Sequence, residues 1–119
     1  SLPPEEEAIV KDPSHLVLLC TCPTMEAAQE IASTLVEDGA AACVNIVTGL
    51  TSVYRWQGET RNDSELLLVV KTTAAAYRRA EETIQRLHAY ELPEIIAVPV
   101  VKGLSDYLHW VTLQTSANQ

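Results

Sequence analysis

The segment from Ala40 to Trp56 reads AAACVNIVTGLTSVYRW, and it decides the fold. It is rich in Val, Ile, Thr and Tyr, which are typical of strands, and Gly49 interrupts it, so it predicts one long strand with a bend. Gln57-Gly58 follows with the residue types of a tight turn, and Ser64 to Thr72 returns as a second strand with an apolar centre. The two segments are therefore expected to pair antiparallel as a hairpin.

Upstream of this hairpin the sequence predicts a strand and then a helix. His15 to Cys22 is almost wholly apolar, the pattern of a strand that is covered on both faces. Pro23-Thr24 offers a helix start and Asp38-Gly39 a helix stop, with apolar residues at helical spacing between them.

Downstream of the hairpin the pattern repeats. Thr72 or Thr73 is expected to cap a second helix that runs to His88, and Ile95 to Val101 is expected to form the last strand. A short helix beginning near Ser105 should close the domain. The order is β-α-β-β-α-β plus a C-terminal helix, an α+β, ferredoxin-like sandwich in which two helices cover one face of the sheet.

The length of the middle strands predicts self-association. About 15 residues at about 3.3 Å each reach roughly 50 Å, whereas a domain of this size has a radius of gyration near 13 Å. The hairpin must therefore bend or project, and it carries apolar residues that a partner would normally cover. Tyr54, Trp56 and Trp110 are expected at an interface between subunits, with the walls of a ligand pocket as the alternative.

Composition limits the class of protein. The chain has 119 residues with 47% hydrophobic and 20% charged, which suits one folded domain over 15–113, between an acidic tail at 1–14 and a second tail at 114–119. A net charge of -8 disfavours nucleic acid and anionic membranes as partners. Three cysteines do not form a disulfide framework, so a reducing compartment, the cytoplasm, is expected.

Five segments, in the same order along the chain, resemble the CutA family. They include an alanine-alanine-cysteine step, a tyrosine-x-tryptophan-x-glycine step and a histidine-x-tyrosine-x-x-proline-glutamate step, in which Ala89 replaces the family's proline. The resemblance covers about His15 to Val111, and the segments are Gly39 to Ile46, Gly49 to Gly58, Lys71 to Thr73, His88 to Ile96, and Asp106 to Trp110.

The resemblance implies a homotrimer whose sheets join between subunits, similar to the PII signalling proteins, and a role in tolerance to copper and other divalent cations. It implies no enzymatic activity and no organic cofactor. The metal-ligand positions of the family match Cys20 and His88, whereas a further histidine of that site is Leu87 in this chain.

The cysteines and the residues after the second helix support two function classes. Cys20 and Cys22 share a face of a strand, but their side chains start about 6.6 Å apart, so both sulfurs would have to lean inward to share an ion. Burial as a small hydrophobic residue is the favoured interpretation of Cys22 and Cys43 and, less strongly, of Cys20, for which metal binding is the alternative.

The first class is therefore a metal-binding protein that uses Cys20 and His88. The second is a PII-like sensing or scaffold trimer that binds a small ligand in a cleft between subunits. That cleft is expected to be framed by His88 and by Asn45, Trp56, Lys71, Tyr90, Glu91 and Glu94.

Overall fold

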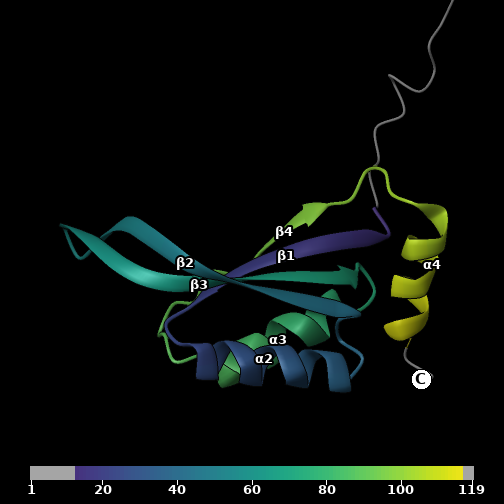
Figure 1. The fold of residues 1–119 in the computed structure, drawn as a ribbon, viewed down its shortest axis with the longest axis horizontal. Helices are drawn as coiled ribbons and strands as arrows, with labels where there is room; N and C mark the ends of the chain where they lie inside the picture. Colours follow the sequence, from purple (N-terminus) through teal and green to yellow (C-terminus); the bar gives the residue numbers. More distant parts are fainter. Residues whose placement is uncertain (1–12, 117–119) are drawn as a thin grey trace, which may run out of the picture.

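Residues 13–116 are described by the structure, a computed structural model, and they form a four-stranded antiparallel sheet with three helices. The elements are β1 (His15–Cys22), α2 (Met25–Glu37), β2 (Cys43–Trp56), β3 (Glu59–Thr73), α3 (Tyr77–Leu87), β4 (Ile96–Pro99) and α4 (Ser105–Gln114). The strand order is β2-β3-β1-β4, with α2 and α3 on one face of the sheet and α4 beside its end (Figure 1). The predicted α+β fold, βαββαβ plus a C-terminal helix, is confirmed.

The bend of the long strand lies where the sequence predicts it. Gly49 has a φ of 79°, a conformation that side chains with a Cβ rarely adopt, and the register of β2 on β3 shifts between Val47 and Leu50. The glycine therefore allows a β-bulge that bends β2 and turns its outer half away from the helices.

The hairpin turn has two residues. Gln57 and Gly58 have φ values of 52° and 83°, and Trp56 pairs with Glu59 across the turn, the geometry that two-residue hairpins favour. β3 therefore begins at Glu59 and not at Ser64. The sequence pattern missed its first residues because the outer part of the hairpin is exposed on both faces and shows no alternation of apolar and polar residues.

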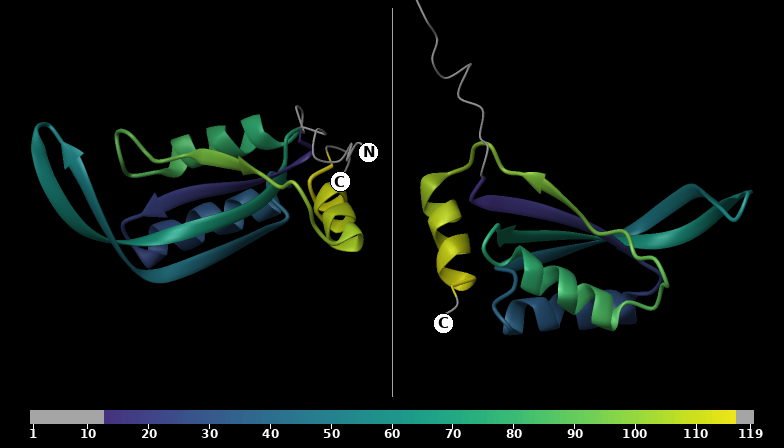
Figure 2. Two further views of the ribbon diagram at one scale, coloured as in Figure 1. Left: turned by 90° about the horizontal axis from the view of Figure 1, so that it is seen from above. Right: turned by 180° about the vertical axis from the view of Figure 1, so that it is seen from behind.

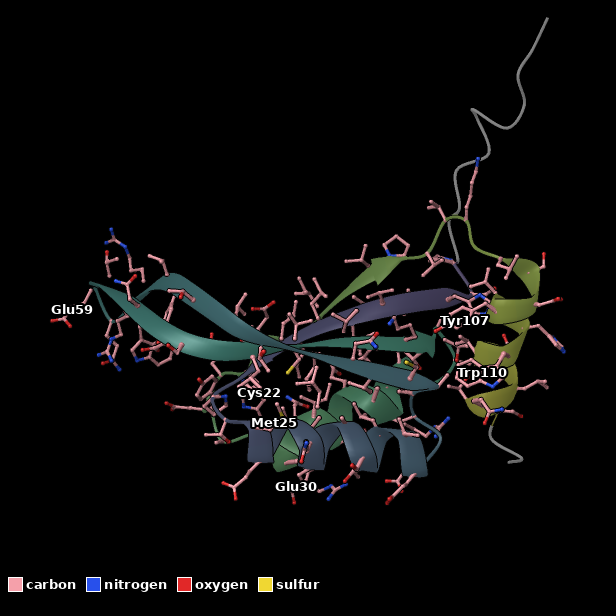
Figure 3. The ribbon with its side chains drawn as sticks, viewed as in Figure 1. Cys22, Met25, Glu30, Glu59, Tyr107 and Trp110 are labelled. Carbon is pink, nitrogen blue, oxygen red and sulfur yellow. The ribbon has the colours of Figure 1, made fainter. Side chains whose placement is uncertain are left out.

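The hairpin projects from the body of the domain, as its length predicts. The described chain measures 52 × 38 × 22 Å with a radius of gyration of 16.1 Å, whereas a compact domain of this length has about 13.5 Å. Glu59 lies at the projecting tip (Figure 3). The views from above and behind show the same ribbon extending beyond both α2 and α3 (Figure 2).

The two sheet-covering helices begin differently. Thr24 caps α2 as predicted, because its Oγ1 accepts a hydrogen bond from the Ala27 amide at 3.1 Å. The predicted cap of α3 by Thr72 or Thr73 is wrong. Thr73 instead accepts from the Ala76 amide in the preceding turn, and Thr72 donates to a backbone carbonyl in the core.

The last strand and last helix differ slightly from the predicted bounds. β4 covers only Ile96–Pro99 because Pro99 already pairs with Leu16, next to the start of β1. α4 extends to Gln114, and Thr115 after it is only 4% exposed, so the folded part runs beyond the predicted boundary at 113. The predicted tails otherwise fall on 1–12 and 117–119, outside the described residues.

The core lies between the sheet and the two helices. Alternate residues of β1 and β3 point toward α2 and α3 and are fully buried. The cluster includes Leu18, Cys20, Cys22, Ile31, Leu35, Leu68, Val70 and Ile84. The intervening residues of the strands lie on the opposite face, where Val47, Ile96 and Val98 are exposed. Much of this face is apolar, although Asn45 and Lys71 also lie on it, and α2 and α3 do not cover it.

Candidate metal site and adjoining cleft

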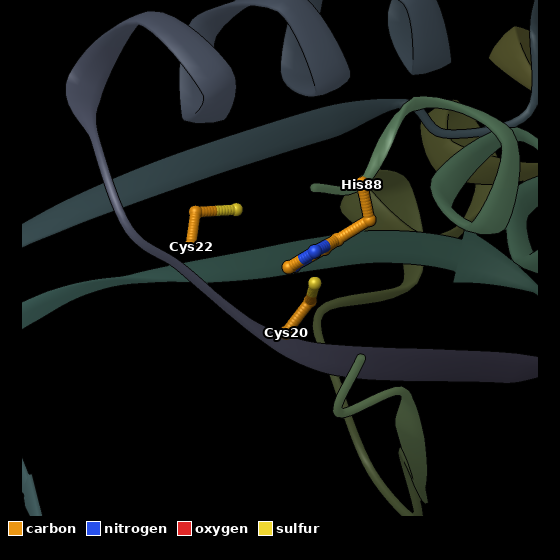
Figure 4. A group of neighbouring side chains, drawn as sticks. All are labelled: Cys20, Cys22 and His88. Carbon is orange, nitrogen blue, oxygen red and sulfur yellow. The ribbon is translucent and has the colours of Figure 1, made fainter. Parts of the chain in front are cut away.

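Three side chains of types that can bind a metal ion meet at the end of β1. Cys20 and Cys22 point from β1 toward the helices, and His88 is the first residue after α3. One donor atom from each lies within 4.8 Å of the other two (Figure 4). The structure thus brings together the predicted pair, Cys20 and His88, and adds Cys22, which the sequence analysis favoured as a packing residue.

The end of β1 explains why His88 lies there. β4 pairs with β1 only as far as Leu19. The His15 carbonyl points to the β4 side of β1 and accepts a hydrogen bond from the Val100 amide. Thr21 lies six residues beyond His15, so its carbonyl points to the same side of the strand, past the end of β4. His88 donates from Nε2 to this carbonyl at 2.7 Å.

These contacts fix the protonation of the imidazole. A carbonyl only accepts, so Nε2 of His88 carries the hydrogen, and Nδ1 accepts a hydrogen bond from the Tyr90 amide at 3.1 Å. The ring is therefore neutral, which is the form that binds metals. If Nδ1 bound a metal ion, the ring would lose only its hydrogen bond from the Tyr90 amide. Nε2–H would keep its hydrogen bond to the Thr21 carbonyl, and a carbonyl is a usual second contact of a metal-bound histidine.

The pKa values of the two thiols are shifted in opposite directions. A hydrogen bond to Cys22, burial and the nearby carboxylates of Glu94 and Glu65 raise the pKa of Cys20 well above its ordinary value. The same hydrogen bond from Cys20 lowers the pKa of Cys22, against the effect of burial. Cys22 is therefore the first of the two to become a thiolate, and acidic side chains nearby favour a cation at this place.

Leu87 offers no donor atom, as the sequence shows, and its side chain packs against the hydrophobic core. The two sulfur donors therefore come from β1, and the nitrogen donor comes from His88, the first residue after α3. They suit a soft or borderline cation such as Cu(I) or Zn(II).

A cleft of about 720 Å³ adjoins this group between the hairpin and the loop after α3. Four of the predicted pocket residues line it: Trp56, Tyr90, Glu91 and Glu94. His88, Asn45 and Lys71, which were also predicted to frame the cleft, do not line it. The side chains of Asn45 and Lys71 are hydrogen-bonded to each other on β2 and β3, nearer the opposite end of the sheet. The cleft also contains charged residues that the sequence analysis missed, namely Arg55, Arg61 and Glu65.

Tyr90 connects the cleft with the group formed by Cys20, Cys22 and His88. Its ring lies 4.8 Å from that of His88, and its hydroxyl donates to Glu65 at 2.7 Å. Glu65 is only 7% exposed. Burial, followed by this carboxylate, raises the pKa of Tyr90 well above its ordinary value. Tyr90 therefore remains a neutral hydrogen-bond donor at physiological pH.

The aromatic residues predicted at an interface are accessible in the single chain. Tyr54 is exposed on the hairpin and donates to Asp63 across it. Trp56 is half-buried, and Trp110 is exposed on α4, where it packs against Tyr107 at 5.6 Å (Figure 3). Their contact with another subunit stays a prediction.

These features define a class: an α+β domain of the ferredoxin-like kind with a cysteine and histidine group at the end of its first strand. The profile of the CutA1 divalent ion tolerance protein family matches residues 16–114. The chain therefore belongs to the CutA1 divalent ion tolerance protein family, as the resemblance predicted.

Relatives and solved structures agree with this assignment. The chain is 52% identical over 99 residues to the divalent-cation tolerance protein CutA of Thermus thermophilus, a match covering 83% of this chain and 96% of that protein. It is 44% identical over 91 residues to protein CutA of Mus musculus, where the match covers 76% of this chain but only 51% of the mouse protein. The shared part is thus about half of the longer mouse relative.

The fold is also shared with solved structures. The divalent cation tolerance protein of Thermus thermophilus superposes with a TM-score of 0.84 at 51% identity, covering 86% of this chain and 99% of that one. CutA of Xylella fastidiosa gives 0.85 at 38% identity, covering 87% and 99%. Proteins of this family are tolerance proteins and not enzymes, in agreement with the sequence prediction. Across residues 13–116, no helix has the length and apolar character needed to cross a membrane.

Proposed function

We propose that the chain binds copper or another divalent cation through Cys20 and His88, as part of a response to metal stress. The observation that carries this proposal is the convergence of their donor atoms within 4.8 Å from β1 and the end of α3. The neutral imidazole and the carboxylates near Cys20 favour a cation there. The names of the relatives, which describe tolerance to divalent cations, point the same way.

The test is a copper titration of the purified, reduced protein with a competing chelator as the reference. Cys20→Ser and His88→Ala should each lower the affinity at least about tenfold, since each removes one ligand. His109→Ala, an exposed histidine on α4, is the matched control and should bind like the parent. Unchanged affinity in both ligand variants would place the copper elsewhere and reject the proposal.

The proposal includes a homotrimer. Its support is the apolar sheet face opposite α2 and α3, together with the projecting hairpin, whose edge strand β2 is free to pair on one side. Both features are typical of surfaces that another subunit covers. Light scattering should give about three times the 13.0 kDa of one chain, and a monomer at micromolar concentration would contradict it.

A second candidate function is supported by the cleft beside the metal group. In a PII-like sensing or scaffold protein, Trp56 and Tyr90 would supply aromatic surface to a small ligand, and Arg55 and Arg61 would bind its anionic groups. Calorimetry with a panel of small anions tests it. Trp56→Ala should abolish such binding while Cys20→Ser leaves it unchanged, and the absence of any binding would reject this candidate.

The three free cysteines support a reducing compartment, and we propose the cytoplasm. The relatives do not share one compartment, since one from Arabidopsis thaliana is described as chloroplastic and one from Archaeoglobus fulgidus as periplasmic. Fractionation of cells that produce the tagged full-length protein would test the proposal. Recovery in a membrane or secreted fraction would contradict it.

A further inference from the structure

We propose that Cys22 is a third ligand of this site, so that two thiolates and one imidazole bind a thiophilic cation of the Cu(I) and Zn(II) class. This inference rests on the proposed function, because it assumes that Cys20 and His88 bind a metal. It goes further by adding a ligand and by naming the class of ion that the site selects.

The convergence of the two sulfurs is the first argument. Side chains on alternate residues of a strand start about 6.6 Å apart. The sulfurs of Cys20 and Cys22 nevertheless lie within 4.8 Å of each other and of a His88 ring nitrogen (Figure 4). An ion with bonds of about 2.3 Å in a trigonal arrangement holds its sulfur donors about 4 Å apart. The distances between the donor atoms would therefore have to shorten by less than about 1 Å to bind such an ion.

The chemistry of the donors is the second argument. Thiolate and imidazole ligands select copper(I) and zinc, whereas calcium and magnesium require oxygen ligands. None of the three donors is an oxygen, and both cysteines are fully buried. Two thiolates also balance the charge of a divalent ion, so a zinc-loaded site would place no net charge in the core.

The competing explanation is that Cys22 only packs in the hydrophobic cluster, of which it is a member. Packing would make Cys22 matter for stability but not for metal affinity. Cys43 offers a matched comparison, because it is a free cysteine on β2 outside the group, on the opposite face of the sheet.

The experiment measures Zn(II) and Cu(I) affinity of the reduced full-length protein by competition with chromophoric chelators, with Mg(II) as the hard ion. Cys22→Ala should weaken both thiophilic ions at least about tenfold, as Cys20→Ser does, and Cys43→Ala should bind like the parent. Thermal melting of the metal-free variants verifies that each is folded. A Cys22→Ser variant gives the same test with less change in volume if Cys22→Ala is unstable.

A second readout counts the thiolates directly. Sulfur-to-metal charge-transfer absorption of the Co(II)-loaded protein should fall by about half in Cys22→Ala, because one of two thiolate ligands is removed. It should not change in Cys43→Ala.

The outcomes separate the two proposals. Tight binding by the parent and by folded Cys22→Ala alike, with full charge-transfer intensity, would overturn the third ligand while leaving Cys20 and His88 as the site. A parent that binds neither ion would overturn both proposals. Binding of Mg(II) as tightly as Zn(II) would overturn the assignment of a thiophilic site.

Discussion

The imidazole of His88 donates a hydrogen bond from Nε2 to the backbone carbonyl of Thr21, at 2.7 Å. Thr21 lies between Cys20 and Cys22, so this one bond ties the end of α3 to the part of β1 that bears both thiols. It uses a carbonyl that lies beyond the last residue pair of β1 and β4. The Cys20, Cys22 and His88 group therefore depends on where β4 stops as much as on the identity of its three residues.

This bond also contributes to stability. His88→Ala should lower the free energy of unfolding of the metal-free protein by about 1–2 kcal/mol, because the Thr21 carbonyl loses its donor. Urea denaturation provides the measurement. His109→Ala should change the value by less than about 0.5 kcal/mol, since His109 is exposed. Equal losses in both variants would show that the Thr21 contact is not formed.

The hydrogen bond between Tyr90 and Glu65 should contribute more to the free energy of unfolding than the tyrosine to glutamate bond within α3. Tyr90→Phe leaves a carboxylate that is almost fully buried without its hydroxyl donor, and we expect a loss of about 1–3 kcal/mol in the free energy of unfolding. Tyr77→Phe is the matched control, because it removes a tyrosine to glutamate bond of 2.9 Å within α3. Its cost should be about 0.5 kcal/mol, and a larger effect there than at Tyr90 would contradict the prediction.

Alkaline pH should destabilise the fold in part through Tyr90. Burial and Glu65 raise the pKa of Tyr90, so the folded chain keeps a proton that the unfolded chain loses above about pH 10. The unfolded state then binds fewer protons, and the free energy of unfolding falls as the pH rises. Tyr90→Phe should show a shallower fall. Urea denaturation on both sides of about pH 10 provides the measurement, and identical slopes would contradict it.

Assembly should depend on Trp56. It lies at the last residue pair before the hairpin turn and is only half-buried in the single chain, so we expect another subunit to cover it. Loss of a packed indole costs about 3–5 kcal/mol, and a trimer contains the substitution three times. Trp56→Ala should therefore shift sedimentation toward monomer. Arg61→Ala should not, and an unchanged oligomer in Trp56→Ala would move Trp56 to a role in the cleft.

The sequence predicted those parts of the fold that depend on local pattern. β1, α2 and the bend at Gly49 follow from apolar periodicity, a threonine cap and the conformational freedom of glycine. The outer half of the hairpin was underestimated, because strand residues that are exposed on both faces carry no periodic signal. The bounds of β4 depend on which residues of β1 it pairs with, and the local sequence pattern of β4 does not reveal that pairing.

The site was predicted less completely than the fold. Family resemblance named Cys20 and His88, and the Cys20-Thr21-Cys22 spacing contained the signal for the third donor. Spacing alone could not show that the two sulfurs converge, since that depends on side-chain rotamers. The prediction of Asn45 and Lys71 in the cleft is wrong, because their side chains are hydrogen-bonded to each other away from it. Their distance from the cleft depends on the register of β2 and β3, which the sequence does not reveal.

The most direct test of metal binding at this site is X-ray absorption spectroscopy of the copper-loaded, reduced protein. We expect sulfur in the first coordination shell together with an imidazole nitrogen, and loss of the sulfur contribution when both Cys20 and Cys22 are replaced. A shell of oxygen and nitrogen atoms alone, unchanged by that double replacement, would contradict it.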